Sequence, residues 1–205
     1  GKTYLPEYRA FYEKRQFRSI REYDGHPVFW EKEEIPFGGK LVFQAGEDFF
    51  FGIEICEDLW AVAPPSNLLA QNGAQLIFNL SAGPELVSKA AYRRELVKMQ
   101  SAKLAAGYVL CGAGVHESTS DLLFSGHALI AANGKLLAEN SRFERQGSIL
   151  YADLKPEWLT ITRRAWTSFN DQPADTARIC KLNPISEAPD WTYFNFDKHP
   201  FVPTV

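Results

Sequence analysis

The feature that most restricts how this chain can fold is a dense apolar run with an abrupt end. Residues 49–55 read FFFGIEI, and Cys56, Glu57 and Asp58 follow at once. A short apolar and aromatic run of this kind is typical of a buried β-strand. A cysteine placed there can be held rigid at a sheet edge, as the serine of a nucleophile elbow is. The pattern therefore predicts a strand-end thiol nucleophile, with a buried structural cysteine as the alternative.

The rest of the chain alternates between strand and helix patterns, which predicts an α/β domain. Further strands are expected over residues 74–81, 108–115 and 148–154, one helix from Pro64 and Pro65 to a stop at Gly73, and a longer helix from about Ser88, a possible cap, to Gly107. Asn133 and Gly134 separate HALIAA from KLLAE. This pair predicts a β-hairpin with a type I′ turn, because both residues accept positive φ.

Composition excludes several functional classes. The 205 residues, 45% of them hydrophobic, suit one core plus a tail. A net charge of −3 gives no basic field for nucleic acid or a membrane surface. Without a spanning run or a leader pattern, we expect a protein of the cytoplasm.

Cys56, Cys111 and Cys180 are too scattered for a disulfide framework, and the latter two are predicted to be structural. The four histidines are dispersed, so no metal site is expected.

Both ends of the chain carry expectations of their own. The sequence begins at Gly1 and Lys2 without an initiator methionine, which suggests a piece of a longer protein. The last forty residues are rich in proline, aspartate and aromatics and show no sustained period. Residues 170–205 are therefore predicted to form a packed linker.

Three segments carry a family resemblance: KTYLPEYRAFYEKRQF at 2–17, GIEICEDLW at 52–60 and HESTSDLLFSGHALIAANGKLLAENSRF at 116–143. They resemble the nitrilase superfamily, and in particular the glutaminase domains of glutamine-dependent NAD synthetases. The resemblance runs from Lys2 to about Phe169. It implies a four-layer αββα sandwich in which residues 1–169 supply the C-terminal two-thirds of the domain, without its N-terminal strands. The linker would then lead to an ATP-dependent synthetase domain absent from this chain.

The same resemblance implies a Glu, Lys, Cys triad. Cys56 matches the nucleophile and Lys2 the lysine. The general acid–base glutamate would lie upstream of Gly1, so the chain alone is expected to be inactive. A thiolate beside an ammonium suits amide cleavage, because the cation favours the thiolate and stabilises an oxyanion. Glu57 is expected in the substrate site, its backbone N–H as second oxyanion donor. Asp58 is expected to be a structural helix-start carboxylate.

Four further residues resemble family positions around the substrate. Tyr8 is expected near the substrate and Glu13 beside the lysine. Ser81 and Arg94 are expected to contact the glutamine head group, with Arg93 as a rival for the latter. From residues alone, the basic helix face of Lys89, Arg93, Arg94 and Lys98 could be either solvated or directed at substrate. Without the motif, Lys2 itself would be interpreted as an ordinary surface lysine.

The implied function is glutamine hydrolysis that supplies ammonia for the ATP-dependent amidation of nicotinic acid adenine dinucleotide. The expected partners are glutamine, the synthetase domain of the same polypeptide and further copies of the chain in a homo-oligomer. Nucleic acid and membranes are not expected partners. No cofactor is expected in this domain, and ATP and Mg²⁺ belong to the synthetase domain. The alternatives are a stand-alone amidase acting on another ω-amide and a non-catalytic assembly domain.

Overall fold

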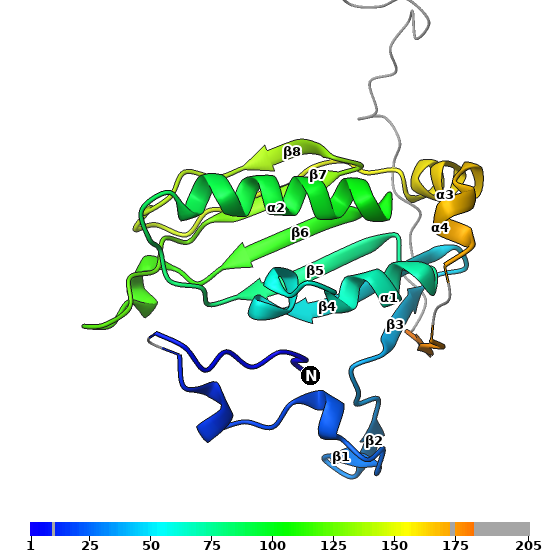
Figure 1. Cartoon of the computed structure of the whole chain (residues 1–205), viewed down its shortest axis with the longest axis horizontal. Helices are drawn as coiled ribbons and strands as arrows, with labels where there is room; N and C mark the ends of the chain where they lie inside the picture. Colours follow the sequence, from blue (N-terminus) through cyan, green and yellow to red (C-terminus); the bar gives the residue numbers. More distant parts are fainter. Residues whose placement is uncertain (10, 173–174, 183–205) are drawn as a thin grey trace, which may run out of the picture.

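A computed structural model describes residues 1–9, 11–172 and 175–182. Its centre is a mixed sheet that, within these residues, has seven strands in the order β8-β7-β6-β5-β4-β3-β9 (Figure 1). The strands are β3 Leu41–Ala45, β4 Phe49–Ile55, β5 Leu76–Ser81, β6 Gly107–Gly112, β7 Ala128–Ala132, β8 Lys135–Glu139 and β9 Arg178–Lys181. Because β4, β5 and β6 are parallel, their carboxyl ends meet at one edge of the sheet, the usual place for a ligand site in an α/β fold.

Helices α1 (Pro65–Gln71) and α2 (Lys89–Leu104) cover one face of this sheet (Figure 1). The core lies between the two layers. Its sheet residues include Val42, Ile77, Tyr108 and Leu129, and its helix residues include Leu69 and Val97. The remaining elements are the hairpin β1 (Val28–Trp30) and β2 (Glu33–Ile35), helices α3 (Pro156–Ala165) and α4 (Thr167–Asn170), and the 3₁₀ turns η1 (Glu13–Arg15), η2 (Ile20–Glu22), η3 (Cys56–Trp60) and η4 (Val115–Glu117).

The elements with the clearest local signals are confirmed. The predicted strand over 49–55 coincides with β4. Helix α1 begins at Pro65, in the first turn, where a backbone N–H has no partner within the helix, so proline loses no hydrogen bond there. Asn133 and Gly134 have φ values of 45° and 84° between β7 and β8. These values match the type I′ turn that the Asn-Gly pair predicts.

Some sequence predictions are wrong. Ser88 precedes α2 but has a φ of 66° and accepts no capping hydrogen bond through its side chain. Residues 148–154 form no strand: Ile149 and Tyr151 are strongly exposed there, and the segment leads into α3, which begins at Pro156. An apolar run becomes a strand only where a neighbouring strand can pair with it.

The segment predicted to be a linker contributes to the sheet. Within 170–205, β9 pairs in parallel with β3. Cys180 lies on β9 and is buried, as expected of a structural cysteine, whereas Cys111, also predicted to be structural, is an exposed thiol at the end of β6. Residues 183–205, the last part of the predicted linker, lie outside the described residues. The domain boundary at 169/170 therefore stays a prediction.

The sheet face opposite α1 and α2 is apolar and partly open. The rings of Phe43 and Phe51 stack at 5.2 Å between centroids, and Phe78 meets Phe51 edge-on at 5.6 Å. Ile53 and Leu80 on the same face are exposed. The described residues thus form one sheet and one helix layer, and they do not supply a second sheet over this face.

Arg163 of α3 joins three parts of the fold. Its guanidinium donates to the carbonyl oxygens of Ala70, Ala74, Leu104 and Ala105, at 2.6–3.2 Å. Ala70 lies in the last turn of α1 and Ala74 just past it, while Leu104 and Ala105 lie at the end of α2. Burial lowers the pKa of Arg163 to about 10, so the side chain remains a cation at neutral pH.

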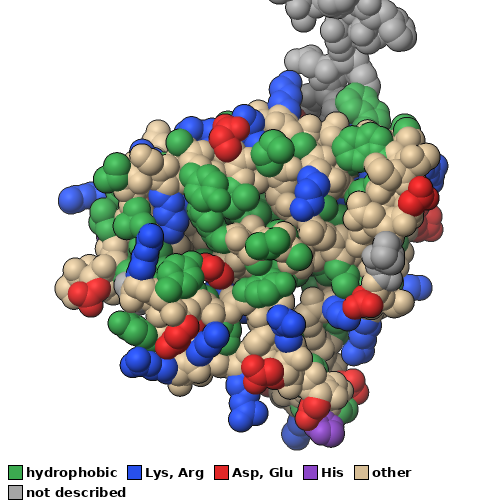
Figure 2. Space-filling model, viewed as in Figure 1, with side chains coloured by type: hydrophobic (Ala, Val, Ile, Leu, Met, Phe, Trp, Pro, Cys, Tyr) green, Lys and Arg blue, Asp and Glu red, His purple; other side chains and the backbone are tan. Residues whose placement is uncertain are grey.

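The surface seen in Figure 2 carries mixed charge. Acidic and basic side chains alternate around its rim, and apolar side chains gather at its centre. A mixed surface of this kind produces no continuous field of one sign on this face. Among the described residues, no helix combines the length and apolar character needed to cross a bilayer.

Candidate active site

Cys56 lies where β4 ends and η3 begins. Its φ is 48°, a left-handed value that is rare for a residue with a side chain, and it is 7% exposed. The neighbouring strands β5 and β6 end at Ser81 and Gly112. A sharp turn directly after a buried strand directs a side chain out of the sheet edge, as in a nucleophile elbow. The geometry agrees with the strand-end thiol that the sequence predicts.

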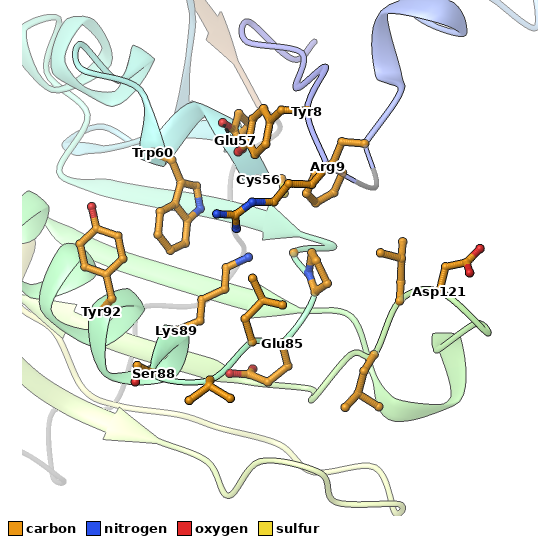
Figure 3. Close-up of a pocket in the computed structure, with 17 residues that line it drawn as sticks. Tyr8, Arg9, Cys56, Glu57, Trp60, Glu85, Ser88, Lys89, Tyr92 and Asp121 are labelled. Carbon is orange, nitrogen blue, oxygen red and sulfur yellow. Dashed lines mark hydrogen bonds between the residues drawn. The ribbon is translucent and has the colours of Figure 1, made fainter.

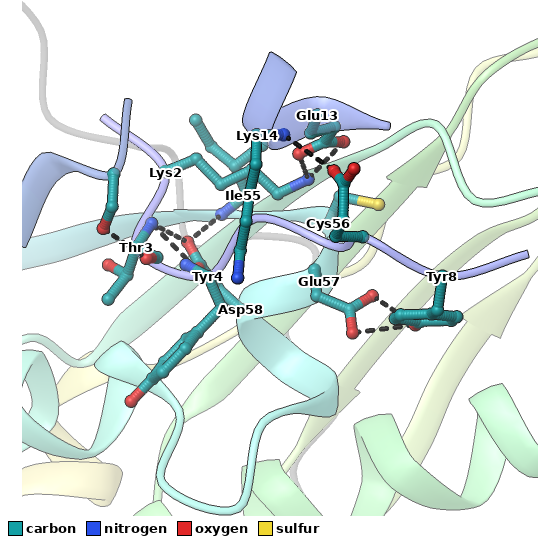
Figure 4. Close-up of polar contacts among 12 residues, drawn as sticks. Lys2, Thr3, Tyr4, Tyr8, Glu13, Lys14, Ile55, Cys56, Glu57 and Asp58 are labelled. Carbon is teal, nitrogen blue, oxygen red and sulfur yellow. Dashed lines mark hydrogen bonds and ion pairs between the residues drawn. The ribbon is translucent and has the colours of Figure 1, made fainter. Parts of the chain in front are cut away.

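Asp58 connects the N-terminal segment to this turn (Figure 4). Its fully buried carboxylate accepts hydrogen bonds from the backbone N–H groups of Thr3 and Tyr4, at 3.0 and 2.8 Å, and from that of Ile55 at 3.1 Å. Burial raises the pKa of Asp58, and these three donors oppose the shift. Asp58 therefore has the structural role expected of it, but it binds a distant segment in addition to the start of η3.

Lys2 is held beside the thiol by this connection. Its Nζ lies 2.7 and 2.6 Å from the two carboxylate oxygens of Glu13, in a partly buried ion pair (Figure 4). Lys2, Glu13, Cys56 and Ser81 all line one cavity of about 650 Å³. The structure thus brings together four of the residues selected from the sequence.

A second cavity, of about 640 Å³, also includes Cys56 in its lining. Figure 3 shows Tyr8 and Glu57 on one side and Lys89 of α2 on the other, with Arg9 reaching in from the N-terminal segment. The volume suits a small molecule. Cys56 therefore lines both the cavity of Lys2 and the cavity of Lys89.

Tyr8 and Glu57 form one wall of the second cavity. The Tyr8 hydroxyl donates to the Glu57 carboxylate oxygens, 2.8 and 3.0 Å away. Burial and this hydrogen bond raise the pKa of Tyr8 to about 12, so its hydroxyl stays a donor at neutral pH. The Glu57 carboxylate is thereby oriented at the cavity that Cys56 lines.

Lys89 is the cation that the second cavity holds on its helix side. Its Nζ lies 5.3 Å from the ring centroid of Trp60. Burial lowers the pKa of Lys89, as does the charge of Arg93, while Cys56, Glu85 and Glu57 act in the opposite direction. An ammonium that has lost part of its hydration at a cavity wall favours an anionic group of a ligand.

Arg94 and Arg93 are placed elsewhere. Arg94 forms a two-pronged ion pair with Glu139 of β8, at 2.8 and 2.6 Å. Arg93 is buried and contacts Glu85 at 3.2 Å and the Nδ1 of His127 at 2.7 Å. Neither arginine lines the two cavities at Cys56. The role of Arg94 in binding the glutamine head group stays a prediction. Lys89, by contrast, lines the second cavity.

Sequence reasoning did not single out Lys89, Arg9 or Trp60. Lys89 belongs to the basic helix face for which the sequence did not decide between solvent and substrate. Only the orientation of α2 shows that Lys89, and not its basic neighbours, faces the cavity. Trp60 ends the CEDLW block, and Arg9 follows the motif tyrosine. No group of three metal-ligating side chains lies together in residues 1–9, 11–172 and 175–182.

The sheet, the strand-end thiol and the adjacent lysine–glutamate pair define an α/β domain of the nitrilase type. A family model described as Carbon-nitrogen hydrolase matches residues 6–164, so the chain belongs to the carbon–nitrogen hydrolase family. This result confirms the family and the fold class expected from the sequence.

Individual known proteins show which members of the family this chain is similar to. The chain is 38% identical over 174 residues to the glutamine-dependent NAD(+) synthetase of Mycobacterium tuberculosis, covering 83% of this chain and 25% of that protein. It is 31% identical over 180 residues to the enzyme of the same name from Rattus norvegicus, covering 80% and 24%. It also resembles the crystal structure of a glutamine-dependent NAD(+) synthetase from Cytophaga hutchinsonii, with TM-score 0.63, 27% identity, and coverage of 73% and 24%. The chain spans about a quarter of the length of these relatives.

Proposed function

We propose that this chain is part of a glutaminase module that releases ammonia for the ATP-dependent synthesis of NAD on another domain of the same polypeptide. The observation that carries the proposal is the placement of Cys56 at a left-handed strand end, in one cavity with the Lys2–Glu13 pair. The named relatives, which are glutamine-dependent NAD(+) synthetases, support it.

The proposed reaction follows from the positions of the charged groups. The Cys56 thiolate attacks the side-chain carboxamide carbon of glutamine and forms a tetrahedral intermediate. The Lys2 ammonium and the backbone N–H of Glu57, in the first turn of η3, stabilise its oxyanion. The amide nitrogen takes up a proton as the C–N bond breaks and leaves as ammonia, and water then hydrolyses the remaining γ-glutamyl thioester to glutamate and free thiol.

The second cavity is the proposed site for the amino-acid end of glutamine. Its carboxylate would approach Lys89 and Arg9, and its ammonium would approach the Glu57 carboxylate that Tyr8 orients. Replacement of Lys89 by methionine keeps much of the side-chain volume but removes the charge. We expect the KM for glutamine to rise roughly ten- to a hundredfold with a smaller change in kcat, because a charged hydrogen bond to substrate is lost.

Lys98→Met is the matched control for Lys89→Met. Lys98 lies on the same helix and pairs with Glu95, at 2.9 Å, away from both cavities at Cys56. Steady-state kinetics with glutamine should show a normal KM for this variant. A normal KM in Lys89→Met as well would remove Lys89 from the proposed substrate site.

Residues 1–205 alone are predicted to hydrolyse glutamine poorly or not at all. Of the carboxylates near Cys56, Glu13 is paired with Lys2, Glu57 accepts from Tyr8, and Asp58 is occupied by backbone donors. Because each of these three already has a partner, we do not expect any of them to act as the general acid–base, a role that contributes about 10² to 10⁴ in rate.

Ammonia release from glutamine should therefore be measured for residues 1–205 and for the full-length protein side by side. The full-length protein should hydrolyse glutamine and use the nitrogen to make NAD, which tests the proposed function itself. Full activity in the short chain would show that it carries its own acid–base group.

A further inference from the structure

Three fully buried polar side chains lie under Cys56, on the helix-covered face of the sheet. They are Glu54 of β4, Asn79 of β5 and Tyr108 of β6, and each is at most 1% exposed. Buried polar groups cost free energy unless their hydrogen bonds are complete. None of the three lines the cavities at Cys56, so contact with substrate does not account for them.

Asn79 forms hydrogen bonds with both the backbone N–H and the backbone carbonyl of Cys56. Its Oδ1 accepts the backbone N–H of Cys56 at 3.1 Å, and its Nδ2 donates to the Cys56 carbonyl oxygen at 3.4 Å. The same Nδ2 donates to the Tyr108 hydroxyl at 3.1 Å. Every hydrogen-bonding group of this amide is thereby used, and two of its three contacts are to Cys56.

The remaining members fix which way the amide points. The Tyr108 hydroxyl has a single proton, which it donates to Glu54. The hydroxyl must then accept from Asn79, which directs Nδ2 at Tyr108 and Oδ1 at the Cys56 N–H. An amide rotated by 180° would bring two acceptors together and two donors together.

Glu54 ties this network to the helix layer. Its second oxygen accepts the backbone N–H of Ser66 at 2.9 Å, in the first turn of α1. The Ser66 hydroxyl accepts from Gln100 of α2 at 2.9 Å. The chain of contacts therefore runs from two packed helices, through three neighbouring strands, to the backbone of one residue.

Cys56 is the residue whose backbone conformation needs support from its surroundings. A φ of 48° is unfavourable for cysteine, and such a conformation persists only where the surroundings impose it. We propose that Asn79, oriented by Tyr108 and Glu54, is a positioning residue that holds Cys56 in the left-handed conformation that presents its thiol to the two cavities. The catalytic part of this proposal rests on the proposed glutaminase function.

Kinetics of the full-length protein test the proposal. Asn79→Ala removes all three contacts, and Tyr108→Phe keeps the ring volume but removes the group that orients the amide. We expect Asn79→Ala to lower kcat for glutamine about a hundredfold with KM within about twofold, since misplacement of a reacting atom by roughly 1 Å has an effect of that size. Tyr108→Phe should lower kcat less, about tenfold, again without a change in KM.

Leu69→Ala is the control for a purely structural effect. Leu69 is buried in the same core and has no polar contact with Cys56. This variant should lose stability in thermal unfolding but keep its kcat at temperatures where it is folded. If Asn79→Ala loses no more kcat than Leu69→Ala, the network contributes to stability alone and the proposal is overturned.

A second measurement separates this proposal from the proposed function. The rate of Cys56 alkylation by iodoacetamide, followed by peptide mass spectrometry, needs no glutamine. We expect it to fall at least fivefold in Asn79→Ala, and an unchanged or faster rate overturns the positioning role. If the wild-type protein fails to hydrolyse glutamine, the proposed function fails, but the alkylation rates still decide the role of Asn79.

Discussion

Glutamine-driven NAD formation by the full-length protein is expected to fall by at least about 10⁴-fold in Cys56→Ala, whereas ammonia-driven formation continues. The thiol is the group that attacks glutamine in the proposed mechanism, and Cys56 lines both cavities of the site. In the proposed function, free ammonia would bypass the thioester and need only the synthetase domain. The measurement is NAD formation from nicotinic acid adenine dinucleotide and ATP, with glutamine or ammonium as nitrogen donor.

Cys180→Ala is a suitable control for that experiment. Cys180 is buried on β9 and lines neither cavity. Both nitrogen donors should support normal synthesis in this variant. Equal loss of both activities in Cys56→Ala would indicate a general folding defect and count against a dedicated glutaminase role.

Lys2→Ala is the second substitution with a large expected effect. Lys2 is one of the two proposed oxyanion donors, and its position is fixed by Glu13 on one side and by the Asp58 contacts of the next two residues on the other. We expect thioester formation to slow by about 10² to 10³, the typical result of removing one oxyanion donor. Rapid-quench measurement of the first turnover isolates this step.

Lys14→Ala separates the Lys2 effect from a general loss of positive charge. Lys14 is exposed, follows Glu13 directly and lines neither cavity at Cys56. Its variant should show normal first-turnover kinetics. A normal first turnover in Lys2→Ala would show that another group stabilises the oxyanion.

The parts of the fold that the sequence predicts well depend on local chemistry. A proline can open α1 whatever lies beyond it, and Asn133 with Gly134 favours one turn type through backbone sterics alone. The strand before Cys56 is equally local, because the run over 49–55, apolar or small except for Glu54, ends just before Glu57 and Asp58. The pairing of Lys2 with Cys56 required the family motif, since 54 residues separate them (56 − 2) and no local pattern connects them.

The structural features that the sequence did not predict depend on the orientation of a helix and on contacts between segments far apart in the chain. Lys89 and Arg94 occupy one basic helix, and only the packing of α2 decides that the first faces the cavity and the second faces Glu139. Asp58 carries the expected helix-start pattern, but its contacts with Thr3 and Tyr4 come from a segment far away in sequence. The run over 148–154 has strand composition but finds no partner strand.

The four carbonyl contacts of Arg163 have a consequence for the order of folding. Four carbonyls at or just past the ends of α1 and α2 receive a donor from a residue 58 to 93 positions later in the chain. During synthesis, these carbonyls lack their guanidinium donor until the segment around Arg163 has emerged and docked. The helix layer that supports the buried network under the nucleophile is therefore completed late, after every strand from β3 to β8 has been made.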